Sequence, residues 1–205
     1  DYGEYDPQND PYIYNHFNES SFQDGKKLNK SKLQKELGLP VKENAMLIGI
    51  VSRMTSQKGF DLVAYIMDEL LATEDVQIVV LGTGEDRYQD MLRYFAQKYP
   101  EKLYANIGYS EEMAHRIYAS CDAFLMPSLF EPCGLSQLMS LRYGTVPIVR
   151  ETGGLKDTVE AYNEYEHTGT GFSFANYNAH EMLGTIRYAL SVFNDHKKEW
   201  NGLVQ

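Results

Sequence analysis

The chain has 205 residues, of which 43% are hydrophobic and 23% are charged, and this composition fits one large α/β domain better than two full domains. Its 19 basic and 29 acidic residues give a net charge of −10, which argues against a nucleic-acid binder or a protein that docks on an anionic membrane. The two cysteines, Cys121 and Cys133, form no CxxC pair, so neither a disulfide framework nor a zinc site is indicated.

Residues 1–25 are rich in Asp, Asn, Tyr, Pro and Ser, which predicts an extended surface segment between domains. Residues 26–205 are expected to form the folded domain, because apolar runs of strand length alternate there with segments of helical periodicity. Strands are expected at residues 46–51, 76–81, 103–107, 123–126 and 146–149. Helices are expected at residues 26–37, 60–71, 86–99, 111–119, 135–143, 155–162 and 179–193, with Ser110 capping the fourth and Gly144 closing the fifth.

This alternation predicts an α/β fold, a Rossmann-like parallel sheet with helices on both faces. Ligands of such sheets bind at the carboxyl ends of the strands. The loops that follow the strands are therefore the places to look for chemistry.

The loop after the first strand contains Arg53 and Lys58. Two cations on one such loop can converge on a single anion, and an Arg fork with a Lys point charge suits a diphosphate. A solvated loop with two basic residues is the alternative.

The next two such loops are less specific. Gly82-Thr83-Gly84 resembles the start of a dinucleotide-binding GxGxxG motif. However, the acidic Glu85 stands where the pyrophosphate would approach, and Arg87 replaces the last glycine of the motif. These glycines are expected to allow a tight turn and close passage of the backbone to a ligand. Tyr109 could stack on a base, but in a chain with 16 tyrosines the residue alone favours an ordinary exposed or core tyrosine.

The loops after the fourth and fifth strands combine glycines with a helix start. Glu131 is presented where a helix begins at Gly134 or Leu135, and the free N–H groups of that helix can hold an anion while the Glu bonds sugar hydroxyls. Thr152, Gly153 and Gly154 again precede a helix. Ordinary helix entries and turns are the alternatives.

The runs SRMTSQKG, FEPCGLSQL and VRETGGLKDTV, in this order on successive strand-to-helix loops, closely resemble the C-terminal domain of bacterial glycogen synthases and plant starch synthases. These are retaining glucosyltransferases of the two-domain GT-B fold, so the resemblance implies one half of that fold. It also implies that Arg53 and Lys58 bind the donor diphosphate as leaving group, and that Glu131 lies beside the donor glucose. By the same resemblance, the substrate-binding residues are Gly82, Tyr109, Cys133, Gly134, Leu135, Ser136, Thr152 and Gly153.

The resemblance implies transfer of glucose from ADP-glucose to the non-reducing end of an α-1,4-glucan, with no cofactor and no metal site. The acceptor glucan is expected to bind mainly to an N-terminal domain whose KVGGL-type loop this sequence lacks, so the chain is expected to be an inactive fragment. No membrane or nucleic-acid partner is expected, and the compartment is the bacterial cytoplasm, or a plastid for a plant enzyme.

Two alternatives remain open. Another GT-B transferase would use a UDP- or GDP-sugar, but many such enzymes carry a second Glu where this sequence has Met139. A nucleotide-binding module without catalysis is the second alternative, and the joint presence of Arg53, Lys58 and Glu131 speaks against it.

Overall fold

Six parallel strands form one sheet in the computed structural model, which describes residues 5–129, 135–151, 160–162 and 169–204. The strands are β1 (Met46–Val51), β2 (Val76–Gly82), β3 (Leu103–Ile107), β4 (Ala123–Met126), β5 (Val146–Arg150) and β6 (Phe172–Phe174). Their order across the sheet is β3-β2-β1-β4-β5-β6, so the order reverses between β1 and β4. The predicted Rossmann-like parallel sheet is confirmed.

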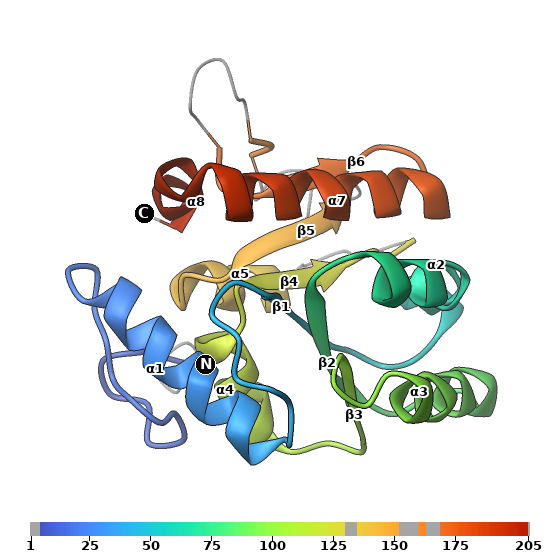
Figure 1. Ribbon diagram of the computed structural model, residues 1–205, viewed down its shortest axis with the longest axis horizontal. Coiled ribbons are helices and arrows are strands. Elements are labelled where there is room, and N and C mark those ends of the chain that lie inside the picture. Colours follow the sequence, from blue (N-terminus) through green and yellow to red (C-terminus); the bar gives the residue numbers. More distant parts are fainter. Residues whose placement is uncertain (1–4, 130–134, 152–159, 163–168, 205) are drawn as a thin grey trace.

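Helices cover both faces of this sheet (Figure 1). One face packs against α1 (Phe22–Glu36), α4 (Glu111–Ser120) and α5 (Leu135–Arg142). The other face packs against α2 (Phe60–Thr73), α3 (Asp86–Lys98), α7 (Ala179–Asp195) and α8 (Lys197–Val204). A short 3-10 helix, η2 (Ser56–Lys58), lies between β1 and α2.

The two helical layers give the protein two hydrophobic cores, and the strands contribute to both. In β1, Ile48 and Ile50 face the core beneath α2 and α7, while Leu47 faces the core beneath α1 and α4. Successive side chains of a strand point to opposite faces, so a strand buried on both sides is apolar throughout. This is why β1 and β4 have the bounds expected from the sequence.

The segment before α1 differs from the expected surface segment, because its side chains pack into the core beneath α1 and α4. Ile13 and Phe17 are buried, and the Tyr5 ring stacks on the ring of His115 in α4 at 3.9 Å between centroids. The buried carboxylate of Asp10 lies 2.6 Å from His115 Nδ1 and accepts a hydrogen bond of 2.5 Å from the Tyr143 hydroxyl. The segment is therefore anchored to the domain, and the division of the chain at residue 25 stays a prediction.

Four elements differ from the sequence expectations. Helix α1 begins at Phe22 rather than at residue 26, because Phe22 joins the core with Phe17. The short strand β6 and the helix α8 were not expected. The helix expected at residues 155–162 lies mostly outside the described residues, and its end is not helical, since Ala161 forms an isolated parallel bridge with Gly171. No described helix is long and apolar enough to cross a membrane.

Candidate functional site

The loop from β1 to α2 holds the two cations that the sequence singled out. Thr55 caps η2 by accepting a hydrogen bond from the Lys58 N–H at 3.3 Å, and Gly59 then starts α2 with a φ of 85°. Arg53 is exposed and Lys58 is half-buried. Both side chains therefore belong to one loop at the carboxyl end of β1, as predicted.

The loop after β4 lies directly against this loop. The Leu129 N–H donates a hydrogen bond of 2.8 Å to the Gln57 carbonyl. A Cβ atom at Gly59 would lie 2.3 Å from the Pro127 carbonyl oxygen, so only a glycine permits this contact. The chain therefore enters residues 130–134 beside the loop of Lys58, at the point where the strand order reverses.

Several predicted site residues lie outside the described residues, namely Glu131, Cys133, Gly134, Thr152 and Gly153. The flanking elements are described: β4 ends at Met126, α5 begins at Leu135 and continues through Ser136, and β5 ends at Arg150. A strand, a loop and a helix thus follow one another as expected at β4. The binding roles of these residues stay predictions.

Gly82 and Gly84 lie close to the backbone of the loop after β1, a contact that was not expected. A Cβ atom at Gly82 would lie 1.8 Å from the Ser52 carbonyl oxygen, and one at Gly84 would lie 2.2 Å from the Met54 carbonyl oxygen. Met54 and Gly84 also form an isolated parallel bridge. These glycines therefore let the loops after β1 and β2 pack against each other, and a contact of Gly82 with a ligand stays a prediction.

Tyr109 follows β3 and precedes the cap of α4. Its side chain is 73% exposed, and the neighbouring Ser110 accepts a hydrogen bond of 3.1 Å from the Met113 N–H, as the predicted cap. The tyrosine is thus available to a ligand above the sheet, which is compatible with the predicted stacking on a base.

Two residues that the sequence did not single out brace the loops after β1 and β4. Arg150, at the end of β5, donates hydrogen bonds to the Leu129 carbonyl at 2.7 Å and the Ser128 carbonyl at 3.4 Å. Its guanidinium lies 5.5 Å from the centre of the Tyr177 ring. Arg150 was visible within the VRETGGL run, whereas nothing in the local sequence around Tyr177 pointed to the site.

The hydroxyl of Tyr177 reaches the loop of Lys58 from the far side. It donates a hydrogen bond of 2.8 Å to the Ser56 carbonyl and also bonds the Asp61 carboxylate. Burial, and then the hydrogen bond to Asp61, raise the pKa of the Tyr177 hydroxyl above its usual range. The phenol therefore stays protonated and acts as a fixed donor.

A further contact network holds the other side of η2. The Ser56 hydroxyl lies 2.5 Å from the Tyr88 hydroxyl and accepts a hydrogen bond of 2.9 Å from Arg87, which also pairs with Glu85 at 3.1 Å. Arg87 and Glu85, which argued against a dinucleotide motif, thus help to position the Lys58 loop. Across the described part of the chain, no cluster of His, Cys and carboxylate side chains could hold a metal ion.

Comparisons with known proteins find one matching family and close relatives. The model of the family "Glycosyl transferases group 1" matches residues 29–199. A glycogen synthase of Lachnospira eligens is 67% identical over the whole chain, and one of Lachnoclostridium phytofermentans is 59% identical. The chain spans 42% of the length of each of these relatives.

Solved structures show the same fold. The catalytic domain of starch synthase IV from Arabidopsis thaliana, bound to ADP and acarbose, superposes with a TM-score of 0.91 at 31% identity, over all of this chain and 42% of that one. Anabaena HepE in complex with UDP-glucose gives a TM-score of 0.66 at 18% identity, over 94% of this chain and 50% of that one, a likeness of fold alone.

Proposed function

The chain belongs to the group 1 glycosyl transferases, and from this premise we propose that it is the donor-binding domain of a glycogen synthase. The whole enzyme would transfer glucose from ADP-glucose to the non-reducing end of an α-1,4-glucan with retention of configuration. The alignment of glycogen synthases with this entire chain at up to 67% identity supports the proposal. Since these relatives are bacterial, the bacterial cytoplasm is favoured over a plastid as the compartment.

One observation carries the proposal: the loop of Lys58 and the loop that leads into residues 130–134 are in direct contact. The hydrogen bond from Leu129 to Gln57 and the fit of Gly59 against Pro127 make the two loops one unit. A nucleotide-sugar needs both groups that hold the diphosphate and groups that hold the sugar, close together. Lys58 and Arg53 would supply the first, and Glu131 the second.

Charge develops in two places during the proposed reaction. The departing ADP gains negative charge, which Arg53, Lys58 and the amino end of α5 would stabilise as preorganised electrostatic groups. The glucose ring becomes oxocarbenium-like, and Glu131 would position it. Tyr109 would pack on the adenine, while Cys133, Gly134, Leu135, Ser136, Thr152 and Gly153 would surround the phosphates and the sugar.

The acceptor glucan would bind mainly to the part of the relatives that this chain does not span. The 205-residue chain would therefore bind ADP without transferring glucose. The proposed reaction needs no metal, because two side-chain cations and a helix end would face the diphosphate.

Calorimetric titration of the chain with ADP, UDP and AMP tests the donor site, with Lys58→Ala as the variant. We expect ADP to bind ahead of UDP and AMP, and Lys58→Ala to weaken ADP about tenfold, the loss of one charge-assisted hydrogen bond. Equal binding of ADP by the variant would remove Lys58 from the site. Preference for UDP would favour a transferase with another donor.

A transfer assay on the full-length enzyme completes the test, with Glu131→Ala as the variant. Incorporation of glucose from ADP-glucose into glycogen should fall strongly in kcat with a modest change in ADP affinity, because the proposed role of Glu131 is in the transition state. Near-normal turnover of this variant would contradict that role.

A further inference from the structure

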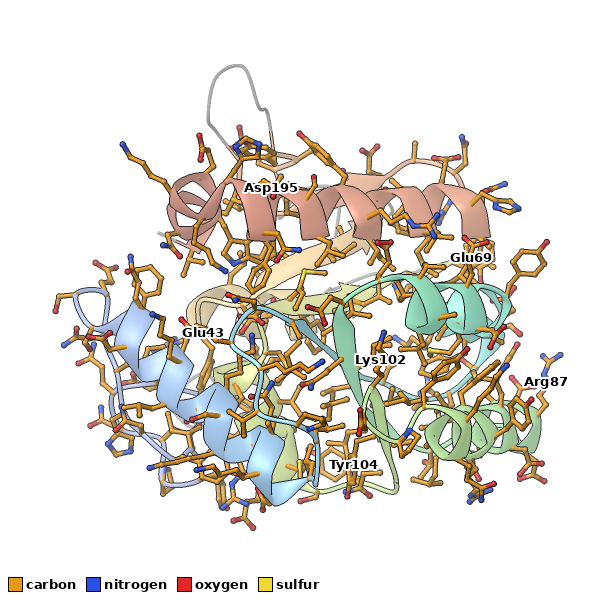
Figure 2. All side chains as sticks on the ribbon, viewed as in Figure 1. Glu43, Glu69, Arg87, Lys102, Tyr104 and Asp195 are labelled. Carbon is orange, nitrogen blue, oxygen red and sulfur yellow. The ribbon has the colours of Figure 1, made fainter. Side chains whose placement is uncertain are left out.

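A cavity of about 270 Å³ lies at the opposite end of the sheet from the candidate donor site. It is enclosed by α1, the end of α7 and α8, and it reaches the residues just before the strands: Glu43 before β1, Asp122 before β4 and Gly144 before β5. Figure 2 shows Glu43 between α1 and the helices α7 and α8. Ligands of the sheet are expected at the other strand ends, so this cavity is separate from the donor site.

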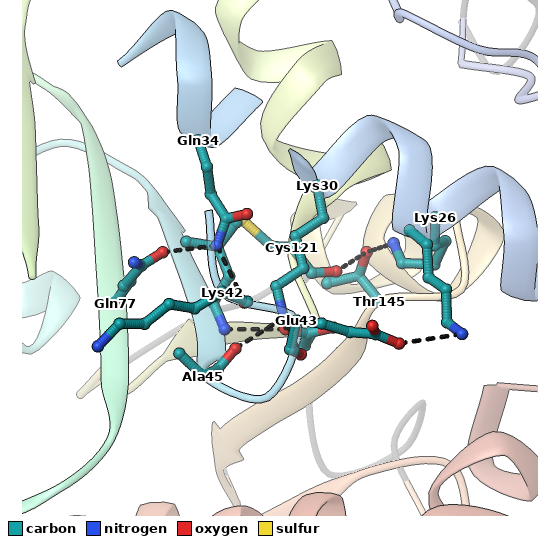
Figure 3. Close-up of polar contacts among 12 residues, drawn as sticks. Lys26, Lys30, Gln34, Lys42, Glu43, Ala45, Gln77, Cys121 and Thr145 are labelled. Atoms are coloured by element: carbon teal, nitrogen blue, oxygen red, sulfur yellow. Dashed lines mark hydrogen bonds and ion pairs between the residues drawn. The ribbon is translucent and has the colours of Figure 1, made fainter. Parts of the chain in front are cut away.

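Two lysines of α1 form a fixed positive base for the cavity. The Lys26 ammonium donates to the carbonyls of Tyr118, Ala119 and Tyr143 and to the Thr145 hydroxyl, at 2.7 to 3.3 Å. The Lys30 ammonium donates to the carbonyls of Glu43 and Ala45 and pairs with Asp122 at 2.8 Å (Figure 3). These contacts hold both cations beneath the cavity.

Two further lysines stand at the mouth, and they are not fixed in this way. Lys27 pairs with Glu43 at 3.0 Å, and both side chains are about two-thirds exposed, at 63% and 66%. The Lys197 ammonium lies 3.2 Å from the centre of the Phe193 ring. Within the described part of the chain, no carboxylate pairs with Lys197.

Positive charge is therefore in excess around this cavity. Four lysines line it, against the two carboxylates of Glu43 and Asp122, in a chain whose net charge is −10. Burial lowers the pKa of Lys26 to about 8 and also lowers the pKa of Lys197, and in both lysines the nearby charge of Asp122 only partly opposes this effect. A bound anion would relieve this excess, because Lys26 and Lys197 have lost water and are repelled by the charge of Lys30.

We propose that this cavity is a binding site for a small phosphate-bearing anion, held by Lys27 and Lys197 above the fixed charges of Lys26 and Lys30. Lys27 would exchange its exposed contact with Glu43 for the anion. The cavity is slightly smaller than the pockets that hold drug-sized ligands, so it suits a phosphate or a compact phosphate monoester. The aromatic walls of Phe193 and Trp200 would accommodate a small organic part.

The only tryptophan of the chain, Trp200, lines this cavity and provides a local probe. Its ring is 4% exposed and stacks on Phe172 at 5.9 Å between centroids. Titration with inorganic phosphate at low ionic strength should therefore change the tryptophan fluorescence in a saturable way. Lys197→Gln should weaken this binding about tenfold, and Lys27→Gln should weaken it as well.

Two control variants separate binding in this cavity from general attraction of charge and from binding at the donor site. Lys198→Gln removes an exposed neighbouring charge that does not line the cavity, and it should leave the phosphate response within about twofold of the parent, as expected for distant exposed charges. Arg53→Gln alters the candidate donor site and should also leave the response unchanged. The phosphate response of the cavity is thus tested separately from binding at the donor site.

The outcomes are distinct. A saturable change in Trp200 fluorescence that is lost in Lys197→Gln and retained in Lys198→Gln would support the site. No change with millimolar phosphate would overturn it. An equal loss in Lys197→Gln and Lys198→Gln would also overturn it, because it would indicate general attraction of charge. A response lost in Arg53→Gln alone would assign the phosphate to the donor site and also overturn the inference.

Discussion

The hydroxyl of Tyr177 donates a hydrogen bond of 2.8 Å to the backbone carbonyl of Ser56, and so ties the start of α7 to the loop that contains Lys58. The same hydroxyl bonds the Asp61 carboxylate in the first turn of α2. The position of the proposed diphosphate-binding lysine thus depends on a residue more than a hundred positions away in the sequence, since Ser56 and Tyr177 are 121 residues apart.

Tyr177→Phe tests this dependence. The change removes one hydroxyl and leaves the Ser56 carbonyl and the Asp61 carboxylate without their donor, which should lower the free energy of unfolding by about 1 kcal/mol. ADP affinity should fall by a few-fold, because the Lys58 loop is less well positioned. Urea denaturation and calorimetric titration measure the two effects, with Tyr65→Phe, 70% exposed on α2, as the matched control. Unchanged ADP affinity in Tyr177→Phe would show that the contact serves stability alone.

Gly59→Ala tests the fit between the loops after β1 and β4. The substitution imposes strain at a φ of 85° and places a Cβ atom 2.3 Å from the Pro127 carbonyl oxygen. Gly38→Ala is the control, since Gly38 has a φ of 75° but no atom within 4 Å of the added Cβ. We expect a loss of about 1 kcal/mol for Gly38→Ala, the cost of the left-handed backbone, and a larger loss for Gly59→Ala. Equal losses in urea denaturation would show that the loops move apart without cost.

Asp10→Asn tests the anchor of the N-terminal segment. The buried carboxylate accepts bonds from both His115 and Tyr143, and an amide oxygen replaces it with a weaker acceptor and an unwanted donor. The free energy of unfolding should fall by about 2 kcal/mol. Limited proteolysis should cut residues 5–21 faster than in the parent, whereas the exposed Asp195→Asn should behave like the parent. A resistant segment in Asp10→Asn would indicate that Ile13 and Phe17 alone retain it.

Lys26→Met tests the cation beneath the proposed phosphate-binding cavity. Burial lowers the folded-state pKa of Lys26 to about 8 from 10.5, so the unfolded state binds more protons between these values. Stability contributed through Lys26 therefore rises with pH across this window, by up to about 3 kcal/mol. As the pH rises from 8 to 10.5, the unfolding free energy of the parent should increase relative to that of the variant. Lys32→Met, on the exposed side of α1, should show no such shift.

Most of the fold was predictable because the strands are buried on both faces. Continuous apolar runs such as that of β2 end at turn residues, and the helices between them have regular apolar spacing. The strand β6 was missed because three residues are too few for a periodicity. The helix α8 was missed because only Trp200 and Leu203 of its residues are buried, which is too few to reveal a helical pattern.

The site was predictable only where its residues follow strands. Arg53, Lys58 and Tyr109 stand on the expected loops because strand ends fix them. The contacts of Tyr177 and Arg150 depend on how distant segments pack, which no local pattern encodes. The packing of Gly82 against the backbone of Ser52 was not foreseen for the same reason, and its contact with a ligand stays a prediction.

The N-terminal segment packs against α4 through contacts of Tyr5 and Asp10 with His115. Tyr5 stacks on His115 in the middle of α4, and the charge of the Tyr109 phenol contributes, after burial, to raising the pKa of Tyr5, so the two phenols lie within electrostatic reach of each other. Because Tyr5 and Asp10 both contact His115, the position of this segment is coupled to the helix whose cap, Ser110, directly follows Tyr109. The loop that carries Tyr109 therefore precedes a helix whose packing includes the N-terminal segment.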